Sequence, residues 1–182
     1  MERFPVHTLD TAPEASKKSL QDVQDRFGMI PNLAGAMATS SVLIGSFVGV
    51  FDKVHGGSFT EPEIQTVLLT DAVTNACAWA VALHSALALK AGLDPADVTA
   101  MRDGRSPADA RLGALSTLAR TLIERRGMLD KESIEHFTAA GFSRELVLEL
   151  ITIVAASTIT NYTGNVTNPP LEPMLQPHEW KQ

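Results

Sequence analysis

Helix start and stop signals recur along almost the whole chain, and they constrain its fold more than any other feature. The segment Thr60 to Glu63 reads TEPE, a capping box with a proline inside the first turn. Asp94, followed by proline, and Asp130 open later segments in the same way, and glycines such as Gly104 stand where those segments would end. Alternating apolar strands joined by hairpin turns do not occur in the sequence. The sequence therefore predicts an all-α fold.

We expect about seven to eight helices, because apolar residues recur every three or four positions between these signals. The expected segments are 15–26, 42–55, a long one that begins after residue 60, 94–104, 106–127, 130–141 and 143–162. The sequence has 182 residues and no linker, which fits a single domain. Four prolines after residue 168 predict an extended tail that packs on the bundle or on a neighbouring subunit, with disorder as the alternative.

Residues 72–89 form a stretch of 18 residues without a formal charge, near the lower limit for a membrane span. Seven of them are alanine, and Thr74, Asn75, His84 and Ser85 are polar. Alanine contributes little transfer free energy, and polar side chains need partners in lipid. We therefore expect a helix that is buried among other helices, and no contact with a membrane.

Charge and cysteine content narrow the classes of partner. The net charge of −6 argues against a nucleic-acid partner, because phosphate contacts need clustered Lys and Arg. A single cysteine excludes an internal disulfide, and no histidine pair at ligand spacing accompanies it, so we expect neither a metal nor a cofactor. The N-terminus has no apolar segment of the secretory type. These features favour a cytoplasmic protein.

Cys77 and His84 are the candidate reactive residues of the uncharged stretch. Asn75 is a residue type that often caps helices, so a helix could restart there and place Cys77 in its first turn, where the helix dipole would lower the pKa of the thiol. Seven positions put Cys77 and His84 on one helix face, ~10 Å apart along the axis, so that a water or substrate would have to bridge them. The alternative is a buried cysteine and a core histidine without a chemical role.

The order of several motifs resembles the carboxymuconolactone decarboxylase / alkylhydroperoxidase D (AhpD-like) family. These motifs are FTEPEIQ at 59–65, NACAWA at 75–80, His84, and AGL at 91–93. Residues 11–14 and 27–33 resemble the N-terminal extension of its peroxidase-related branch, and 139–143 with Asn161 resemble its closing segment. The resemblance implies an AhpD-like helical bundle in one domain, with a helical extension at 1–58, a core at 59–165 and an extended tail at 166–182.

Peroxidases of that family use a C-x-x-C pair, a histidine and a glutamate. The resemblance places Cys77 at the first cysteine, His84 at the histidine and Gln65 at the glutamate, and these three are the candidate catalytic residues. Ala80 stands at the second cysteine, which is the one that attacks peroxide in the family, so the dithiol cycle is excluded. Asp71 and Glu63 are nearby acids that could replace the missing glutamate.

Three functions follow from the resemblance. The first is a divergent AhpD-like peroxidase or peroxiredoxin-type antioxidant oxidoreductase with a one-cysteine mechanism, in which Cys77 is oxidised to a sulfenic acid and reset by an external thiol. The second is a decarboxylase-type enzyme with His84 as general acid or base. The third is a non-catalytic ligand-binding protein. We rank the first narrowly above the third, and the second lowest.

The expected partners are a small-molecule substrate and further copies of the chain. The substrate would be a hydroperoxide or a small organic acid, as the resemblance implies. The uncharged stretch and the apolar tail exceed what one small bundle hides, and family members form oligomers, so we expect a homo-oligomer.

Overall fold

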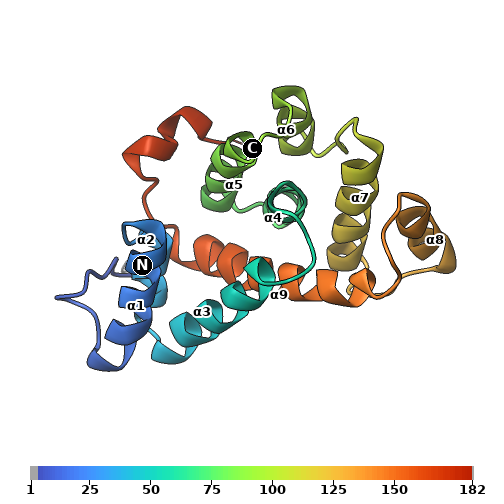
Figure 1. Cartoon of the computed structure of the whole chain (residues 1–182). Helices are drawn as coiled ribbons and strands as arrows, with labels where there is room; N and C mark the ends of the chain where they lie inside the picture. Colours follow the sequence, from blue (N-terminus) through green and yellow to red (C-terminus); the bar gives the residue numbers. More distant parts are fainter. Residues whose placement is uncertain (1–3, 182) are drawn as a thin grey trace.

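The computed structural model describes residues 4–181, and these residues form ten helices and no strand (Figure 1). Residues 1–3 and 182, at the ends of the expected extension and tail, lie outside this range. The helices are α1 (Glu14–Phe27), α2 (Asn32–Met37), α3 (Ser41–His55), α4 (Glu61–Thr74), α5 (Ala78–Lys90), α6 (Pro95–Arg102), α7 (Ala110–Glu124), α8 (Lys131–Ala139), α9 (Leu146–Thr167) and the 3-10 helix η1 (Pro173–His178). The all-α prediction is confirmed, and the expected count of seven to eight is too low.

Helix α4 lies at the centre of the fold and packs against α5, α7 and α9 (Figure 1). All its residues from Glu63 to Ala72 are buried, although the segment includes a glutamine and an aspartate. Two apolar cores form on its flanks. One joins α4 and α5 to the N-terminal helices, and the other joins α4 to α7, α8 and α9. Any polar side chain on α4 must therefore find its partners inside the protein.

The uncharged stretch is two helices and not one buried helix across 72–89, and the helix that we expected to restart at Asn75 begins at Ala78. Helix α4 ends at Thr74, and Ala76 adopts a left-handed conformation with φ of 52°. The Cys77 N–H donates to the carbonyl oxygen of Ala72 at 2.9 Å, which closes the end of α4 before α5 begins at Ala78. Cys77 is thus the N-cap residue of α5, and Asn75 is the C-cap residue of α4.

Helix α9 is long and apolar enough, by length and composition, to cross a membrane, and it is the one such helix within residues 4–181. Buried residues make up 39% of its apolar window, and its inner face contacts α2, α3, α4, α5 and α7. A core helix of a soluble protein passes the same test. Helix α9 is longer than expected. It continues beyond the expected end at residue 162 to Thr167, and Asn168 then adopts a left-handed conformation with φ of 43°.

The tail packs on the bundle, as expected, but part of it is helical. Arg102 donates to the carbonyl oxygens of His178 and Glu179, both at 2.9 Å, and Trp180 Nε1 donates to the Arg102 carbonyl at 3.1 Å. Glu172 reaches α2, where its Oε1 accepts from the backbone N–H of Asn32 at 2.6 Å. Helix α2 follows Pro31 and has no side-chain cap of its own, so this distant carboxylate supplies one.

Candidate functional site

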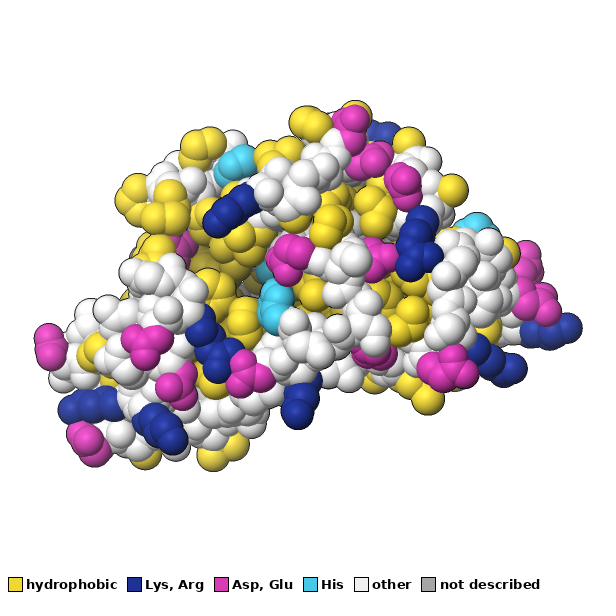
Figure 2. All heavy atoms as spheres, in the orientation of Figure 1, with side chains coloured by type: hydrophobic (Ala, Val, Ile, Leu, Met, Phe, Trp, Pro, Cys, Tyr) yellow, Lys and Arg dark blue, Asp and Glu magenta, His cyan; other side chains and the backbone are white. Residues whose placement is uncertain are grey.

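An apolar cavity of about 200 Å³ lies between the N-terminal helices α1–α3 and the helices α4, α5 and α9. Figure 2 shows a hollow in this face that is lined mainly by hydrophobic side chains, with histidine atoms at its edge. Aromatic and aliphatic residues form most of the wall. The polar side chains in the lining are His55, Glu61, Gln65, His84 and Thr160, together with the indole of Trp79. The helices expected as an N-terminal extension thus build half of the site.

Four of these polar residues form a chain that runs from the interior to the surface. His84 Nδ1 on α5 lies 3.0 Å from Gln65 Oε1 on α4. Gln65 Nε2 donates to Glu61 Oε1 at 2.7 Å, one helical turn earlier. The other oxygen of Glu61 lies 3.3 Å from Nδ1 of His55, at the end of α3. His84 and Gln65 are buried, with 8% and 2% of their surfaces exposed, whereas the side chains of His55 and Glu61 are 29% and 50% exposed.

His84 is a neutral imidazole at physiological pH. Burial lowers its pKa, and the nearby His55 lowers it further, to about 3. No carboxylate touches the ring, because the amide of Gln65 stands between His84 and Glu61. A neutral imidazole has one N–H and one bare nitrogen, so His84 can donate one hydrogen bond and accept another.

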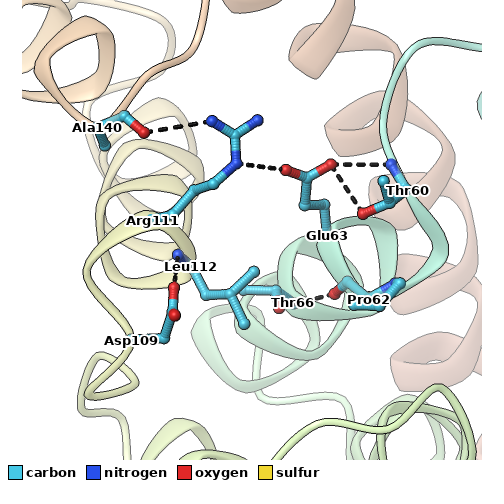
Figure 3. A network of polar contacts seen from close by, with 8 residues as sticks. All are labelled: Thr60, Pro62, Glu63, Thr66, Asp109, Arg111, Leu112 and Ala140. Carbon is cyan, nitrogen blue, oxygen red and sulfur yellow. Dashed lines mark hydrogen bonds and ion pairs between the residues drawn. The ribbon is translucent and has the colours of Figure 1, made fainter.

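Neither acid considered as a replacement for the family's glutamate reaches the cavity. Glu63 points the other way (Figure 3), where its Oε1 accepts from Arg111 Nε at 2.8 Å and its Oε2 accepts from the Thr60 N–H at 2.8 Å. Burial raises the pKa of Glu63, but the hydrogen bonds from Thr60 and Arg111 outweigh it, and the pKa lies below its ordinary value. Glu63 is therefore a capping and ion-pair residue.

Asp71 is enclosed between α4 and α9 and does not line the cavity. Among the described residues neither of its oxygens makes a hydrogen bond of normal geometry. Burial raises the pKa of Asp71 well above its ordinary value, and the approach of Ser157 offsets this only in part. The acid at the cavity is Glu61, which we did not predict. The sequence could have indicated Glu61, because it lies four positions before Gln65 and therefore on the same helix face.

Cys77 is separated from the cavity. The residue is 1% exposed and is absent from the lining. Its sulfur packs against α9 so closely that a Cβ at Gly164 would lie 2.6 Å from Sγ. Burial raises the pKa of the thiol, and the N–H groups of Ala80 and Trp79 lower it by less. The predicted low pKa is therefore wrong, because the loss of hydration outweighs the helix N-terminus.

The structure thus brings together two of the three candidate residues, Gln65 and His84, and leaves Cys77 outside their cavity. Ala80, at the second cysteine position, is fully buried in the core. Trp79 was noted only as part of a motif, yet it lines the cavity and donates from Nε1 to Glu172 Oε2 at 3.0 Å. Residues 4–181 contain no cluster of three or more His, Cys, Asp or Glu side chains that could hold a metal ion.

Comparison with known proteins gives structural matches alone. No family model matches the chain, and no curated protein matches it. A peroxidase-related protein from Ralstonia eutropha JMP134, described as an alkylhydroperoxidase AhpD core, superimposes with a TM-score of 0.83 at 19% identity, over 95% of this chain and 93% of that one. A peroxidase-related protein from Silicibacter sp. TM1040 gives a TM-score of 0.76 at 18% identity, over 94% and 91% of the two chains.

A third solved structure is the debrominase Bmp8, with a TM-score of 0.76 at 17% identity, over 96% of this chain and 94% of that one. A Cys-to-Ala variant of Bmp8, solved in complex with 2,3,4-tribromopyrrole, gives 0.75 at 15% identity, over 98% and 95%. These likenesses span nearly the full length of both chains and agree with the motif order in the sequence. The chain therefore has the AhpD-like fold of the peroxidase-related proteins.

Proposed function

We propose that this protein binds a compact, mostly apolar, uncharged molecule in the cavity between α1–α3 and α4–α5, and that His84 is the residue that contacts the polar end of that molecule. The observation that carries the proposal is the cavity itself. Its wall is apolar except for one edge, where buried hydrogen bonds hold His84 and Gln65 in place. A concave apolar site with a few convergent polar groups is the usual form of a small-molecule site.

The size of the cavity limits the ligand. An apolar cavity of about 150 Å³ holds a benzene molecule. The cavity described here measures about 200 Å³, which suits a single ring with a few small substituents or an aliphatic chain of similar bulk. Larger molecules would have to displace side chains of α3 or α5.

The charge of the lining favours a neutral ligand. The described residues that line the cavity include no Lys or Arg, and Glu61 contributes a carboxylate to the polar edge. A carboxylate brought into an apolar site without a cationic partner loses its hydration and gains nothing in return. A small organic acid is therefore the less suitable of the two expected substrates, and a neutral molecule such as a hydroperoxide or a halogenated ring fits better. The tribromopyrrole bound to the Bmp8 variant is a compact, halogenated ring of this kind.

A test of this proposal measures thermal stability in the presence of compact neutral rings, including 2,3,4-tribromopyrrole. A ligand of the native state raises Tm by mass action, by about 5 °C or more at a concentration roughly a hundredfold above Kd. Ala156→Leu would extend a side chain into the cavity and abolish the shift. Ala155→Leu is the matched control, because Ala155 immediately precedes Ala156 in α9, is exposed and does not line the cavity. Equal shifts in both variants would place the ligand elsewhere, and no shift in the unaltered protein would refute the proposal.

One-cysteine peroxide reduction is the second candidate, and the N–H groups of Trp79 and Ala80 at the Cys77 sulfur favour it. In that reaction the thiolate attacks the terminal peroxide oxygen, the O–O bond breaks, a sulfenic acid forms, and the alkoxide takes a proton from water and leaves as an alcohol. Two molecules of an external thiol then return the sulfenic acid to the thiol, with release of water and a disulfide. Loss of free thiol at stoichiometric cumene hydroperoxide, absent in Cys77→Ser, would support this candidate. A native thiol that survives the peroxide would exclude it.

General acid catalysis by His84 has less support. An imidazole with a pKa of about 3 is neutral near neutral pH, so His84 has no acidic imidazolium proton to give to a substrate. Its conjugate base is also weak, because the same burial that removes the proton disfavours the imidazolium. A decarboxylase-type reaction that depends on proton transfer at His84 therefore ranks below binding.

We also propose that the chain forms a homo-oligomer. Helix α9 leaves four large apolar side chains exposed along its outer side: Leu148, Ile151, Tyr162 and Val166. An apolar stripe of this length is typical of contacts between subunits. Light scattering at known concentration would measure the mass, which we expect to exceed 19.5 kDa and to fall toward it in a Leu148→Lys and Val166→Lys double variant.

A further inference from the structure

We infer that Glu61 fixes one tautomer of His84, with the proton on Nδ1, and that the bare Nε2 makes the cavity selective for ligands that carry an N–H or O–H group. This inference rests on the proposed binding function and names the chemistry that the site would recognise. Glu61 acts here as a positioning residue, since its effect on His84 is transmitted through the amide of Gln65.

The first step is the orientation of the Gln65 amide. An amide side chain offers an oxygen that accepts and a nitrogen that donates, whereas a carboxylate only accepts. Glu61 Oε1 lies 2.7 Å from the amide of Gln65, so the nitrogen of that amide must face Glu61. The amide oxygen is then turned toward α5. One carboxylate therefore sets which end of Gln65 meets His84.

The second step is the tautomer of His84. Gln65 Oε1 lies 3.0 Å from Nδ1, and an amide oxygen can only accept, so Nδ1 must carry the proton and donate. A neutral imidazole has no second proton, which leaves a lone pair on Nε2. Among the described residues Nε2 has no hydrogen-bond partner, and it is not sealed inside the protein. Since the His84 ring lines the cavity, this lone pair is open to a ligand.

The outer end of the chain holds Glu61 in place. Its second oxygen lies 3.3 Å from His55 Nδ1, and the His55 ring packs against Phe51 with ring centroids 4.2 Å apart. Both oxygens of Glu61 thus have partners on defined elements, one on α3 and one on α4. Replacing the carboxylate by an amide keeps the shape of the side chain but removes the requirement that Gln65 present its nitrogen.

The consequence is a chemical selection rule. A ligand with an N–H or O–H group can donate to Nε2, whereas an ether or a halide of the same size leaves two acceptors facing each other in an apolar site. Leaving a buried acceptor unpaired costs about as much as a lost hydrogen bond, equivalent to a preference of about tenfold. Phenols, pyrroles and hydroperoxides satisfy the rule, and aryl ethers do not.

The tautomer can be measured without any ligand. We would label the histidines with ¹⁵N and record the imidazole nitrogen shifts, assigning His84 by its loss in His84→Gln. The expected spectrum has a protonated Nδ1 and a bare Nε2. In Glu61→Gln a second, Nε2-protonated population of His84 should appear, while Glu63→Gln, the matched control on the same helix, should leave the spectrum of His84 unchanged. A protonated Nε2 in the unaltered protein would overturn the inference.

The selection rule is tested by affinity for three compounds of similar size: para-cresol, para-fluorotoluene and para-methylanisole. Binding followed by calorimetry should favour para-cresol by about tenfold over the other two, and Glu61→Gln should reduce this preference to about threefold or less. Equal affinities in the unaltered protein would overturn the selection rule even if the tautomer is correct. Binding of none of the three, with the tautomer as expected, would instead refute the proposed binding function.

Discussion

The start of helix α5 and its middle differ in what they offer to a ligand. At its N-terminus the sulfur of Cys77 packs against the backbone of α9, away from the cavity. Two turns later, His84 lies at the wall of an apolar cavity. Polar contacts through Gln65 and Glu61 connect it to His55 at the surface. The sequence treats these residues as one pair, whereas the fold puts them in different environments.

The spacing of Cys77 and His84 in the motif does not by itself make a site. Both residues have pKa values shifted by burial toward their neutral forms, the thiol upward and the imidazole downward. Only His84 combines that neutrality with open space and an oriented partner. A neutral group beside a cavity can bind a ligand, and a neutral group packed against a helix backbone stabilises the fold. Of the two candidate residues, His84 lies beside the cavity and Cys77 does not, while their catalytic roles stay predictions.

The largest effect should be the protection of the thiol. An aromatic disulfide reagent should react with native Cys77 at least about a hundredfold more slowly than with the chain unfolded in urea, because the sulfur is buried and protonated. The reading is unambiguous, since the chain has one cysteine and Cys77→Ser gives the blank. Equal rates in the two states would remove the contrast between Cys77 at the start of α5 and His84 in its middle.

The next effect is the pH dependence that His84 imposes on stability. The pKa of His84 is about 3 in the folded state and 6.5 in an unperturbed histidine, so between these values the unfolded chain binds a proton that the native protein does not. The free energy of unfolding should therefore fall as the pH drops below 6.5, by about 2 kcal/mol at pH 5. Urea titrations at both pH values would measure it.

His84→Gln serves as the reference, since the same titrations in that variant contain every other titrating group. Subtracting the pH dependence of its unfolding free energy from that of the unaltered protein gives the contribution of the His84 imidazole. A difference that stays flat from pH 6.5 to 5 would mean that His84 titrates normally in the folded state and is not a buried neutral ring.

A packing test addresses the start of α5, at Cys77. Gly164→Ala would place a Cβ 2.6 Å from the Cys77 sulfur, and we expect a loss of about 1 to 2 kcal/mol of unfolding free energy despite the better helix propensity of alanine. Cys77→Ala combined with Gly164→Ala should recover most of this loss, which thermal unfolding of the four proteins in a double-mutant cycle would show. Additive effects would mean that the two side chains do not meet.

The smallest effect concerns Asp71, which titrates with the opposite sign to His84. Burial raises its pKa in the folded state, so its contribution to stability is present at low pH and is lost as the pH rises through the folded pKa. Asp71→Asn should therefore gain stability relative to the unaltered protein as the pH is raised from 5 to 8. Chemical denaturation at both values would measure the trend, and a constant difference would argue that Asp71 is ionised in the native state.

Local sequence signals predicted much of the fold because helix caps act within one turn. The side chains of Asp94 and Asp130 accept hydrogen bonds from backbone N–H groups at the starts of α6 and α8. Thr60 and Glu63 form the expected capping box of α4. The expected restart at Asn75 indicated a break between α4 and α5 but not where α5 begins, because the break depends on a left-handed alanine at position 76, a conformation that alanine rarely adopts. Helix α2 was missed because its cap comes from Glu172.

The candidate site was predicted in part for a similar reason. The resemblance placed Gln65 and His84 at related positions, and the structure brings them within 3.0 Å, while their catalytic role stays a prediction. It could not place Cys77 outside the cavity, because the position of its sulfur depends on a glycine in α9 that lies 87 residues away in the sequence. His55 was missed because its contact with Glu61 joins the end of α3 to the start of α4.

The carboxylate of Glu172 has a further consequence, which concerns the order in which the chain is made. Its two oxygens meet the start of α2 and the indole of Trp79, two walls of the cavity that are synthesised long before it. A growing chain can therefore synthesise α2 and α5 on the ribosome, but it cannot join them through this residue until Glu172 has itself been made. The cavity reaches its final shape only after Glu172 has left the ribosome, long after the residues that form its walls.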